Sequence, residues 1–233
     1  MVSLKNIFTD AMHLFFPHNC QGCGSDLLPK KSILCLRCIS NLPYTGFETI
    51  ENNPIENIFR GRVDIIAASS TFYFSKGHLI QHLIHQFKYK GNIETGQYLG
   101  ALMGKNLLQS GRFSNIDYLI PLPLFADKEF KRGFNQSEII CNGMADVMNV
   151  PVLAKNVIRK RYTDTQTKKH RAERWENVEG SFAINDPVKL QGKNILLVDD
   201  VITTGATLEA CAVCMQNVPG INISFTTLAT ASK

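Results

Sequence analysis

The sequence lacks the features that would mark a membrane protein, a secreted protein or a strongly charged one. No apolar run approaches the roughly eighteen residues of a transmembrane helix, and the N-terminus has no apolar core followed by a cleavage site. The net charge is only +5 on 233 residues, which suits phosphate ligands but is not diagnostic of nucleic-acid binding. There is no internal repeat or low-complexity segment. We therefore expect a soluble, cytoplasmic protein without membrane insertion.

Cysteines are few, but four of the seven form two Cys-x2-Cys pairs. Glycines at positions 22 and 24 permit the tight turn of the first pair. Four thiolates at this spacing match a tetrahedral structural zinc site in a small ribbon. Two disulfides in a secreted protein are the alternative, and the missing secretion signal favours the metal. We expect zinc to be bound by Cys20, Cys23, Cys35 and Cys38.

The remaining cysteines and a series of histidines indicate structural roles. Cys211 and Cys214 share the pair spacing but lie in an apolar helical segment, so we predict that they face the core, as does Cys141. Three histidines recur at helical spacing without an acidic or cysteine partner nearby, which favours a solvated helix face. They are His78, His82 and His85.

The most informative segment joins a buried strand to a polar loop and a helix. Residues 195–198 are apolar, Asp199 and Asp200 follow them, residues 203–207 are small and mostly polar, and a helix is expected from Leu208. Ligands of open α/β sheets bind at such a corner. The helix N-terminus suits a phosphate, and paired carboxylates suit a diol or a divalent metal. A ribose 5-phosphate supplies both groups, whereas an acidic turn before a capped helix is the structural alternative.

This segment resembles the signature with which type I phosphoribosyltransferases bind phosphoribosyl pyrophosphate (PRPP). The resemblance implies that Asp199 and Asp200 engage the ribose hydroxyls and are the catalytic residues of an enzyme. It also implies that the loop wraps the 5-phosphate and that magnesium accompanies PRPP. The implied PRPP-binding residues are Asp199, Asp200, Val201, Thr203, Thr204, Gly205, Ala206 and Thr207.

Strand and helix patterns alternate after a polar stretch at residues 48–56, where we place a domain boundary. Residues 1–60 are predicted to form a zinc-ribbon domain with an N-terminal helix over 3–16, and residues 61–233 a phosphoribosyltransferase-like domain. The alternation predicts an α/β fold with a parallel sheet flanked by helices. Strands are expected within 64–74, 118–122, 195–198 and 221–228, and helices over 79–87, 93–108, 136–148 and 208–216.

Two basic segments are candidates for pyrophosphate binding. Residues 123–136 are read as a loop leading to a helix that Asn135 can cap, and a glycine there lets the backbone approach a ligand. Residues 159–177 lie between core elements and could close over a polyphosphate. Solvated surface segments are the structural alternative for both. The candidates are Lys131, Arg132, Gly133, Lys168, Arg171 and Arg174.

In this order, the motifs resemble the ComF family of competence proteins essentially end to end. They are the four-cysteine ribbon, Phe87-Lys-Tyr-Lys-Gly91, Pro121-Leu-Pro123, Arg132-Gly-Phe-Asn-Gln136, Thr165-Gln166, Arg174, Asn177-Val-Glu-Gly-Ser-Phe182 and the signature at 198–205. The resemblance implies a type I phosphoribosyltransferase domain behind a zinc ribbon. It also implies a role in natural transformation, where single-stranded DNA is handled on the cytoplasmic side. Residues 125–127 depart from the His-Pro-like or basic start of that loop.

Three functions stay open at this point. A competence factor would bind PRPP or another ribose 5-phosphate nucleotide and act on single-stranded DNA with other competence proteins. A phosphoribosyltransferase of nucleotide metabolism or salvage would transfer phosphoribosyl from PRPP to a base or amine and release pyrophosphate. A regulatory or nucleic-acid-binding module would keep the fold without turnover. The ribbon favours the first and third, and the intact signature argues against a fully degenerate site. Candidate stacking residues for DNA are Tyr44, Phe47 and Trp175, for which packing is the alternative.

Overall fold

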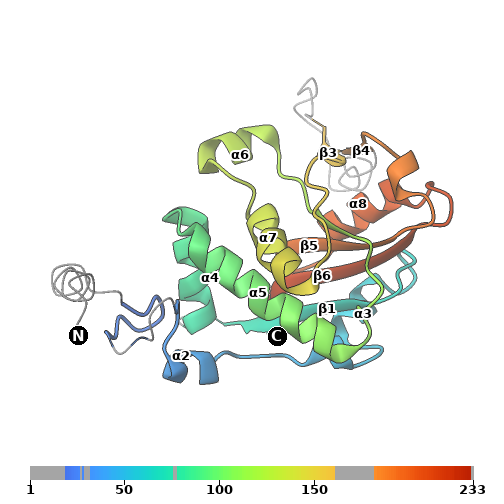
Figure 1. The fold of residues 1–233 in the computed structure, drawn as a ribbon. Helices are drawn as coiled ribbons and strands as arrows, with labels where there is room; N and C mark the ends of the chain where they lie inside the picture. Colours follow the sequence, from blue (N-terminus) through green and yellow to red (C-terminus); the bar gives the residue numbers. More distant parts are fainter. Residues whose placement is uncertain (1–18, 27, 29–31, 76–77, 161–180, 232–233) are drawn as a thin grey trace, which may run out of the picture.

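The computed structural model describes residues 19–26, 28, 32–75, 78–160 and 181–231. Its centre is a parallel sheet of four strands in the order β1-β6-β5-β2 (Figure 1). All neighbouring strands of this sheet pair in parallel, which confirms the predicted α/β class. The strands are β1 (Ala68–Phe74), β2 (Tyr118–Pro121), β5 (Asn194–Ile202) and β6 (Asn222–Ala231).

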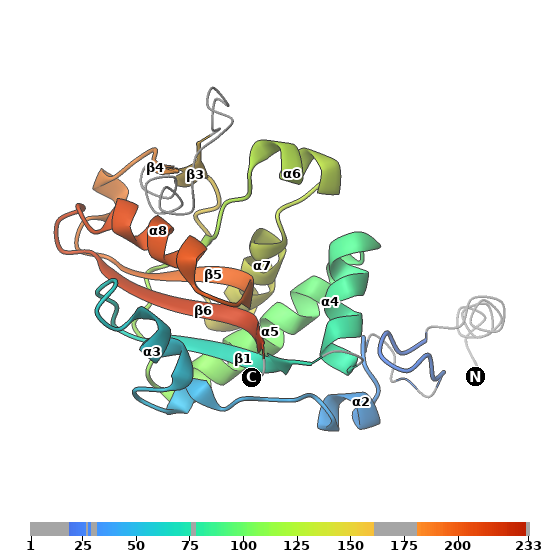
Figure 2. The same cartoon turned by 180° about the vertical axis from the view of Figure 1, so that it is seen from behind.

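Helices cover both faces of the sheet (Figures 1 and 2). The central strand β5 alternates: Leu196 and Val198 belong to one buried cluster, and Ile195 and Leu197 to the other. This double burial explains why its sequence is a continuous apolar run. One face packs on α4 (Leu79–Tyr89), α5 (Ile93–Ser110) and α7 (Gln136–Met148), and the other on α3 (Pro54–Phe59) and α8 (Ala206–Met215).

Shorter elements complete the described fold. A two-stranded antiparallel sheet lies above α8 and consists of β3 (Val157–Arg159) and β4 (Phe182–Ile184) (Figure 1). The others are α2 (Leu36–Ser40), η1 (Phe47–Thr49), α6 (Ala126–Arg132) and η3 (Val188–Leu190). Residues 123–136, read as a loop from the sequence, therefore contain a helix.

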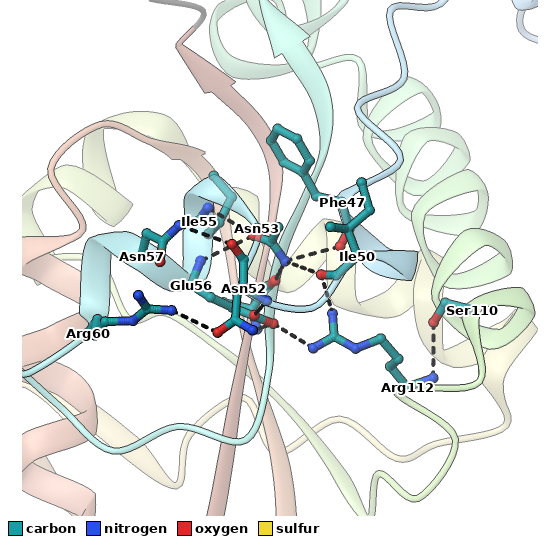
Figure 3. A network of polar contacts seen from close by, with 11 residues as sticks. Phe47, Ile50, Asn52, Asn53, Ile55, Glu56, Asn57, Arg60, Ser110 and Arg112 are labelled. Carbon is teal, nitrogen blue, oxygen red and sulfur yellow. Dashed lines mark hydrogen bonds and ion pairs between the residues drawn. The ribbon is translucent and has the colours of Figure 1, made fainter.

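A polar network fixes the segment before β1 (Figure 3). Asn53 is 1% exposed, and its amide nitrogen donates to the carbonyls of Phe47, Ile50 and Ala68 at 2.8–3.1 Å. Its amide oxygen accepts from two N–H groups at the start of α3, so the same side chain caps that helix. Glu56 accepts from Arg112 Nη2 at 2.7 Å and from Ala68 N at 3.1 Å. The polar stretch is thus tied to the sheet and to the end of α5, while the domain boundary at residue 60 stays a prediction.

Two differences from the expected elements concern the site. β5 continues to Ile202, so Asp199 and Asp200 lie within the end of the strand rather than after it. α8 begins at Ala206, two residues before the predicted start. The expected helix over 3–16 and most of the second basic segment lie outside the described residues. Within the part that is described, no helix is long and apolar enough to cross a membrane.

Candidate functional site

The paired carboxylates stand at the carboxyl end of β5, where elements from both faces of the sheet converge. Asp199 Oδ1 accepts a hydrogen bond from Ser137 Oγ at 3.0 Å and from the backbone N–H of Asp200 at 2.8 Å. Ser137 lies in the first turn of α7, whose N-cap is Asn135, as predicted. The sheet and α7 therefore hold Asp199 in one orientation before any ligand arrives.

The environment of Asp199 makes it easily protonated. Burial, followed by repulsion from Asp200, raises the pKa of Asp199 to about 7 against the opposing effect of its hydrogen bonds and of Lys88. Near neutral pH this carboxyl is poised between its neutral and charged forms. A ligand that donates hydroxyl hydrogen bonds or brings a cation would favour the charged form.

Asp200 has a basic partner that the sequence did not predict. Lys88 Nζ lies 2.7 Å from Asp200 Oδ2, and both side chains are only 16% exposed. Lys88 comes from the last turn of α4. The sequence contained it in the Phe87–Gly91 motif, but only the packing of α4 brings it to the carboxylate.

The predicted phosphate loop forms a small hollow. It is lined by Asp199 and by residues 201–208, so all the implied PRPP-binding residues except Asp200 border it. Gly205 is the N-cap of α8 and has φ 74°, a left-handed conformation that favours glycine. A Cβ there would come within 2.8 Å of the Phe59 ring. The loop N–H groups and the start of α8 make this hollow suitable for a phosphate.

Arg62 supports the phosphate loop from outside. Its guanidinium donates to the carbonyl oxygens of Thr204 at 3.2 Å and Ile58 at 3.0 Å. It also forms an ion pair with Glu209 in the first turn of α8. Arg62 links the α3 end to the loop, a role that no sequence motif indicated.

The first basic segment places its charges at the end of α6. Arg132 Nη1 donates to Gln136 Oε1 at 2.8 Å, and the Arg132 guanidinium lies 5.9 Å from the centre of the Tyr89 ring. Lys131 is exposed, and Gly133 ends the helix with φ 81°. Their pyrophosphate roles stay predictions. Lys168, Arg171 and Arg174 lie outside the described residues.

Arg159 of β3 begins the second basic segment, but nothing in the sequence singled it out. Its guanidinium lies between two aromatic rings, 3.9 Å from the centre of Phe125 and 5.2 Å from that of Phe182. Burial lowers the pKa of Arg159, while the charge of Asp199 acts in the opposite direction. Its buried Nε has no hydrogen-bond partner within the described ranges.

The four predicted zinc ligands come together. Their sulfur atoms all lie within 4.8 Å of one another, and Cys23 Sγ is 3.7 Å from Cys35 Sγ. A tetrahedron with zinc–sulfur bonds of about 2.3 Å has edges of about 3.8 Å. The arrangement of one four-sulfur group, rather than two bonded pairs, fits a zinc ion.

Backbone groups around the cluster prepare one sulfur for metal binding. Burial raises the pKa of Cys20, but N–H groups of Cys35, Cys23 and Gly22 outweigh it and lower that pKa to about 6. The N–H groups of Gly22 and Cys35 lie 3.4 and 3.3 Å from the sulfur. Burial and the other three sulfurs raise the pKa of Cys38, so in this cluster the thiolate form that binds metals is favoured at Cys20 and not at Cys38.

The cysteine module packs directly on α4. A Cβ at Gly22 would meet Leu79 at 2.7 Å and Cys38 Sγ at 2.9 Å, so this position leaves no room for a side chain. Asn92, which caps α5, donates to Gln21 Oε1 at 2.9 Å. The segment with the four cysteines therefore contacts the first residue of α4 and the N-cap of α5, on either side of Lys88 in the chain.

The other predictions have separate outcomes. Cys141 and Cys211 are fully buried, as predicted, and Cys214 is partly buried. Phe47 is 8% exposed and packs edge-on against Tyr73, so packing dominates there, whereas Tyr44 packs on Phe72 but is still 40% exposed. Trp175 lies outside the described residues. The exposed histidines confirm the solvated face of α4; they are His78, His82 and His85.

Comparisons with known proteins found a matching family model and several relatives. A family model described as a phosphoribosyl transferase domain matches residues 135–232. The DNA utilization protein YhgH of Salmonella typhi is 31% identical over 133 residues, which cover 56% of this chain and 58% of that protein. Competence protein F of Haemophilus influenzae is 26% identical over 207 residues, covering 84% and 89%. Competence protein ComFC of Bacillus subtilis is 27% identical over 161 residues, covering 67% and 61%.

Solved structures give more distant similarities. Glutamine PRPP amidotransferase from B. subtilis is 16% identical, with a TM-score of 0.40 over 57% of this chain and 25% of that one. A hypoxanthine phosphoribosyltransferase from Staphylococcus aureus is 13% identical, with a TM-score of 0.36 over 59% and 64%.

Proposed function

Since this chain is a ComF- and YhgH-like protein with a phosphoribosyltransferase domain, we propose that it binds PRPP and acts in natural competence, in the uptake or handling of transforming single-stranded DNA. The observation that carries the proposal is the site at the end of β5. There, the carboxylates of Asp199 and Asp200 adjoin a hollow at the start of α8. A ligand with a diol beside a phosphate matches both features, and PRPP is such a ligand.

The chain's own residues divide the binding task. Asp199 and Asp200 accept hydrogen bonds from the ribose hydroxyls, and residues 203–207 donate backbone N–H groups to the 5-phosphate. Magnesium would enter with the phosphates of PRPP and neutralise part of their charge. We place it with the ligand because Asp200 already pairs with Lys88. Zinc would bind the four cysteines and supply folding free energy to a module too small for a large core of its own.

Contact with single-stranded DNA is the second part of the proposal. Tyr89 is 66% exposed and Phe130 89% exposed, and Arg132 lies against Tyr89. Exposed aromatic rings beside cations suit bases that stack and phosphates that carry charge. Among the described residues we prefer this surface for stacking, because Tyr89 and Phe130 are more exposed than Tyr44 (40%) and Phe47 (8%). The same proposal implies that this protein contacts other competence proteins and is located in the cytoplasm.

An active phosphoribosyltransferase of nucleotide metabolism or salvage is the second candidate. The half-buried Arg159 of β3 is near enough for the charge of Asp199 to affect its pKa, and its Nε has no partner in the described structure, as in a residue awaiting a polar ligand. The reaction would displace pyrophosphate at C1 of PRPP by a base or amine. Cationic side chains would stabilise the charge that develops on the leaving group.

Transformation of a competent host separates these functions. We expect deletion of the gene to lower transformation sharply without a purine or pyrimidine requirement. The double variant Asp199→Ala/Asp200→Ala should reproduce the deletion, while the exposed control pair Asp64→Ala/Asp146→Ala should transform normally. A nucleobase requirement with normal transformation would overturn the competence role and support salvage. Normal transformation by the double variant, with failure of Cys20→Ser, would instead support a module without turnover.

A further inference from the structure

Lys88 approaches the carboxylates from the side opposite the phosphate loop. α4 belongs to the buried cluster on one face of the sheet, and α8 belongs to the cluster on the other face. Figure 2 shows α8 and α4 on opposite sides of the β5 end. Lys88 Nζ and the hollow therefore flank the carboxylates from opposite directions.

The shape of ribose determines which group of the sugar points in each of these two directions. The 2,3-diol lies on one edge of the ring, while C1 and C4, which carries C5 and its phosphate, lie on either side of the ring oxygen. When the diol rests on Asp199 and Asp200 and the 5-phosphate occupies the hollow, the substituent at C1 must point away from the phosphate loop. That direction leads to Lys88.

A second cation lies at the same end. The Arg132 guanidinium contacts the ring of Tyr89, the residue that follows Lys88 in α4. Two separate helices, α4 and α6, thus bring positive charge to the C1 end of the bound sugar. Pyrophosphate carries several negative charges, whereas the free hydroxyl of ribose 5-phosphate carries none.

From this geometry we propose that Lys88 contacts the group at C1 and makes the site select a ligand with an anionic substituent there over ribose 5-phosphate. The proposal rests on the proposed PRPP site and assigns its specificity. In the free protein Lys88 neutralises Asp200, and on binding it shares its donors with the pyrophosphate. A lysine suits this exchange because its ammonium is a mobile point charge with three donors.

The test compares the affinities of PRPP and ribose 5-phosphate by calorimetry, with magnesium, for wild type, Lys88→Met, Lys88→Arg and Lys90→Met. Lys90 is exposed at the end of the same helix and serves as the matched control. Lys88→Met should weaken PRPP by about 10- to 100-fold, the range for losing a hydrogen bond between charged groups. Ribose 5-phosphate should weaken by much less. Lys88→Arg should keep most of the preference, and Lys90→Met all of it.

The ratio of the affinities for PRPP and ribose 5-phosphate tests the role of Lys88 at C1. Any effect of Lys88 through Asp200 would change both affinities alike and leave this ratio unchanged. An unchanged ratio in Lys88→Met overturns the inference while leaving PRPP binding intact. Failure of wild type to bind either ligand overturns the proposed function itself. Lys88→Gln repeats the measurement if the Met variant does not melt cooperatively.

Discussion

Replacing Asp199 by Asn should make the protein more stable at alkaline pH. Burial and Asp200 raise the pKa of Asp199 from 3.8 to about 7. The folded state therefore holds this proton more tightly than the unfolded chain does. As pH rises from about 4 to about 7, the unfolded state ionises first, and stability falls. Asparagine has nearly the same shape and no proton to lose, so the variant escapes this loss.

The size of the effect follows from the two pKa values. Because the pKa rises from 3.8 to about 7 on folding, wild type at pH 8 has lost about 4 kcal/mol of unfolding free energy relative to low pH. Of this, roughly 1–2 kcal/mol is already lost at pH 5 by the same relation. The stability difference between variant and wild type should therefore shift by about 2–3 kcal/mol in favour of the variant between pH 5 and pH 8. Lost hydrogen bonds from Ser137 or Asp200 add a constant that does not change with pH.

Urea unfolding of the zinc-loaded protein, followed by circular dichroism at several pH values between 5 and 8, measures this difference. Asp146→Asn, at an exposed position of α7, is the control and should track wild type. A difference between Asp199→Asn and wild type that stays constant across this range would refute the reasoning. A constant difference would mean that the Asp199 carboxylate is already ionised at pH 5 in the folded protein, so that its pKa is not raised.

Three further outcomes are expected. The protein should carry about one zinc per chain by elemental analysis; Cys23→Ser should lose it and Cys214→Ser keep it, and loss in both would contradict the four-sulfur site. Asn53→Ala should cost roughly 2–4 kcal/mol in urea unfolding, since a cap and three hydrogen bonds disappear, whereas the exposed Asn57→Ala should cost far less. Gly205→Ala should destabilise more than Gly111→Ala by melting temperature, because both have positive φ but only Gly205 faces Phe59; equal losses would argue against that contact.

The sequence predicted the parts of the site that are contiguous in the chain. The apolar run before Asp199 predicted the strand β5, and the small residues up to Thr207 predicted the loop that borders the hollow at the start of α8. The paired cysteines identified their own cluster, because spacing and ligand chemistry are local properties. Each of these features could be read without knowing how the helices pack.

The contacts that orient those parts could not be read in this way. Lys88 meets Asp200, and Arg62 meets Thr204, only after α4 and α3 have packed on opposite faces of the sheet. β3 and β4 are three residues each, too short for a hydrophobic period to be visible. α6 is mostly polar and buries none of its residues, so its pattern looked like a basic loop.

The most direct test of the central claim is calorimetric titration of PRPP with magnesium into wild type, Asp200→Asn and Thr204→Val, with Asp146→Asn as control. We expect saturable binding by wild type and by the control. Binding should be weaker for Asp200→Asn, which loses a charged partner of the ribose, and for Thr204→Val, which loses a hydroxyl beside the hollow. Equal affinities in all four proteins, or no binding by wild type, would contradict a PRPP site at the end of β5.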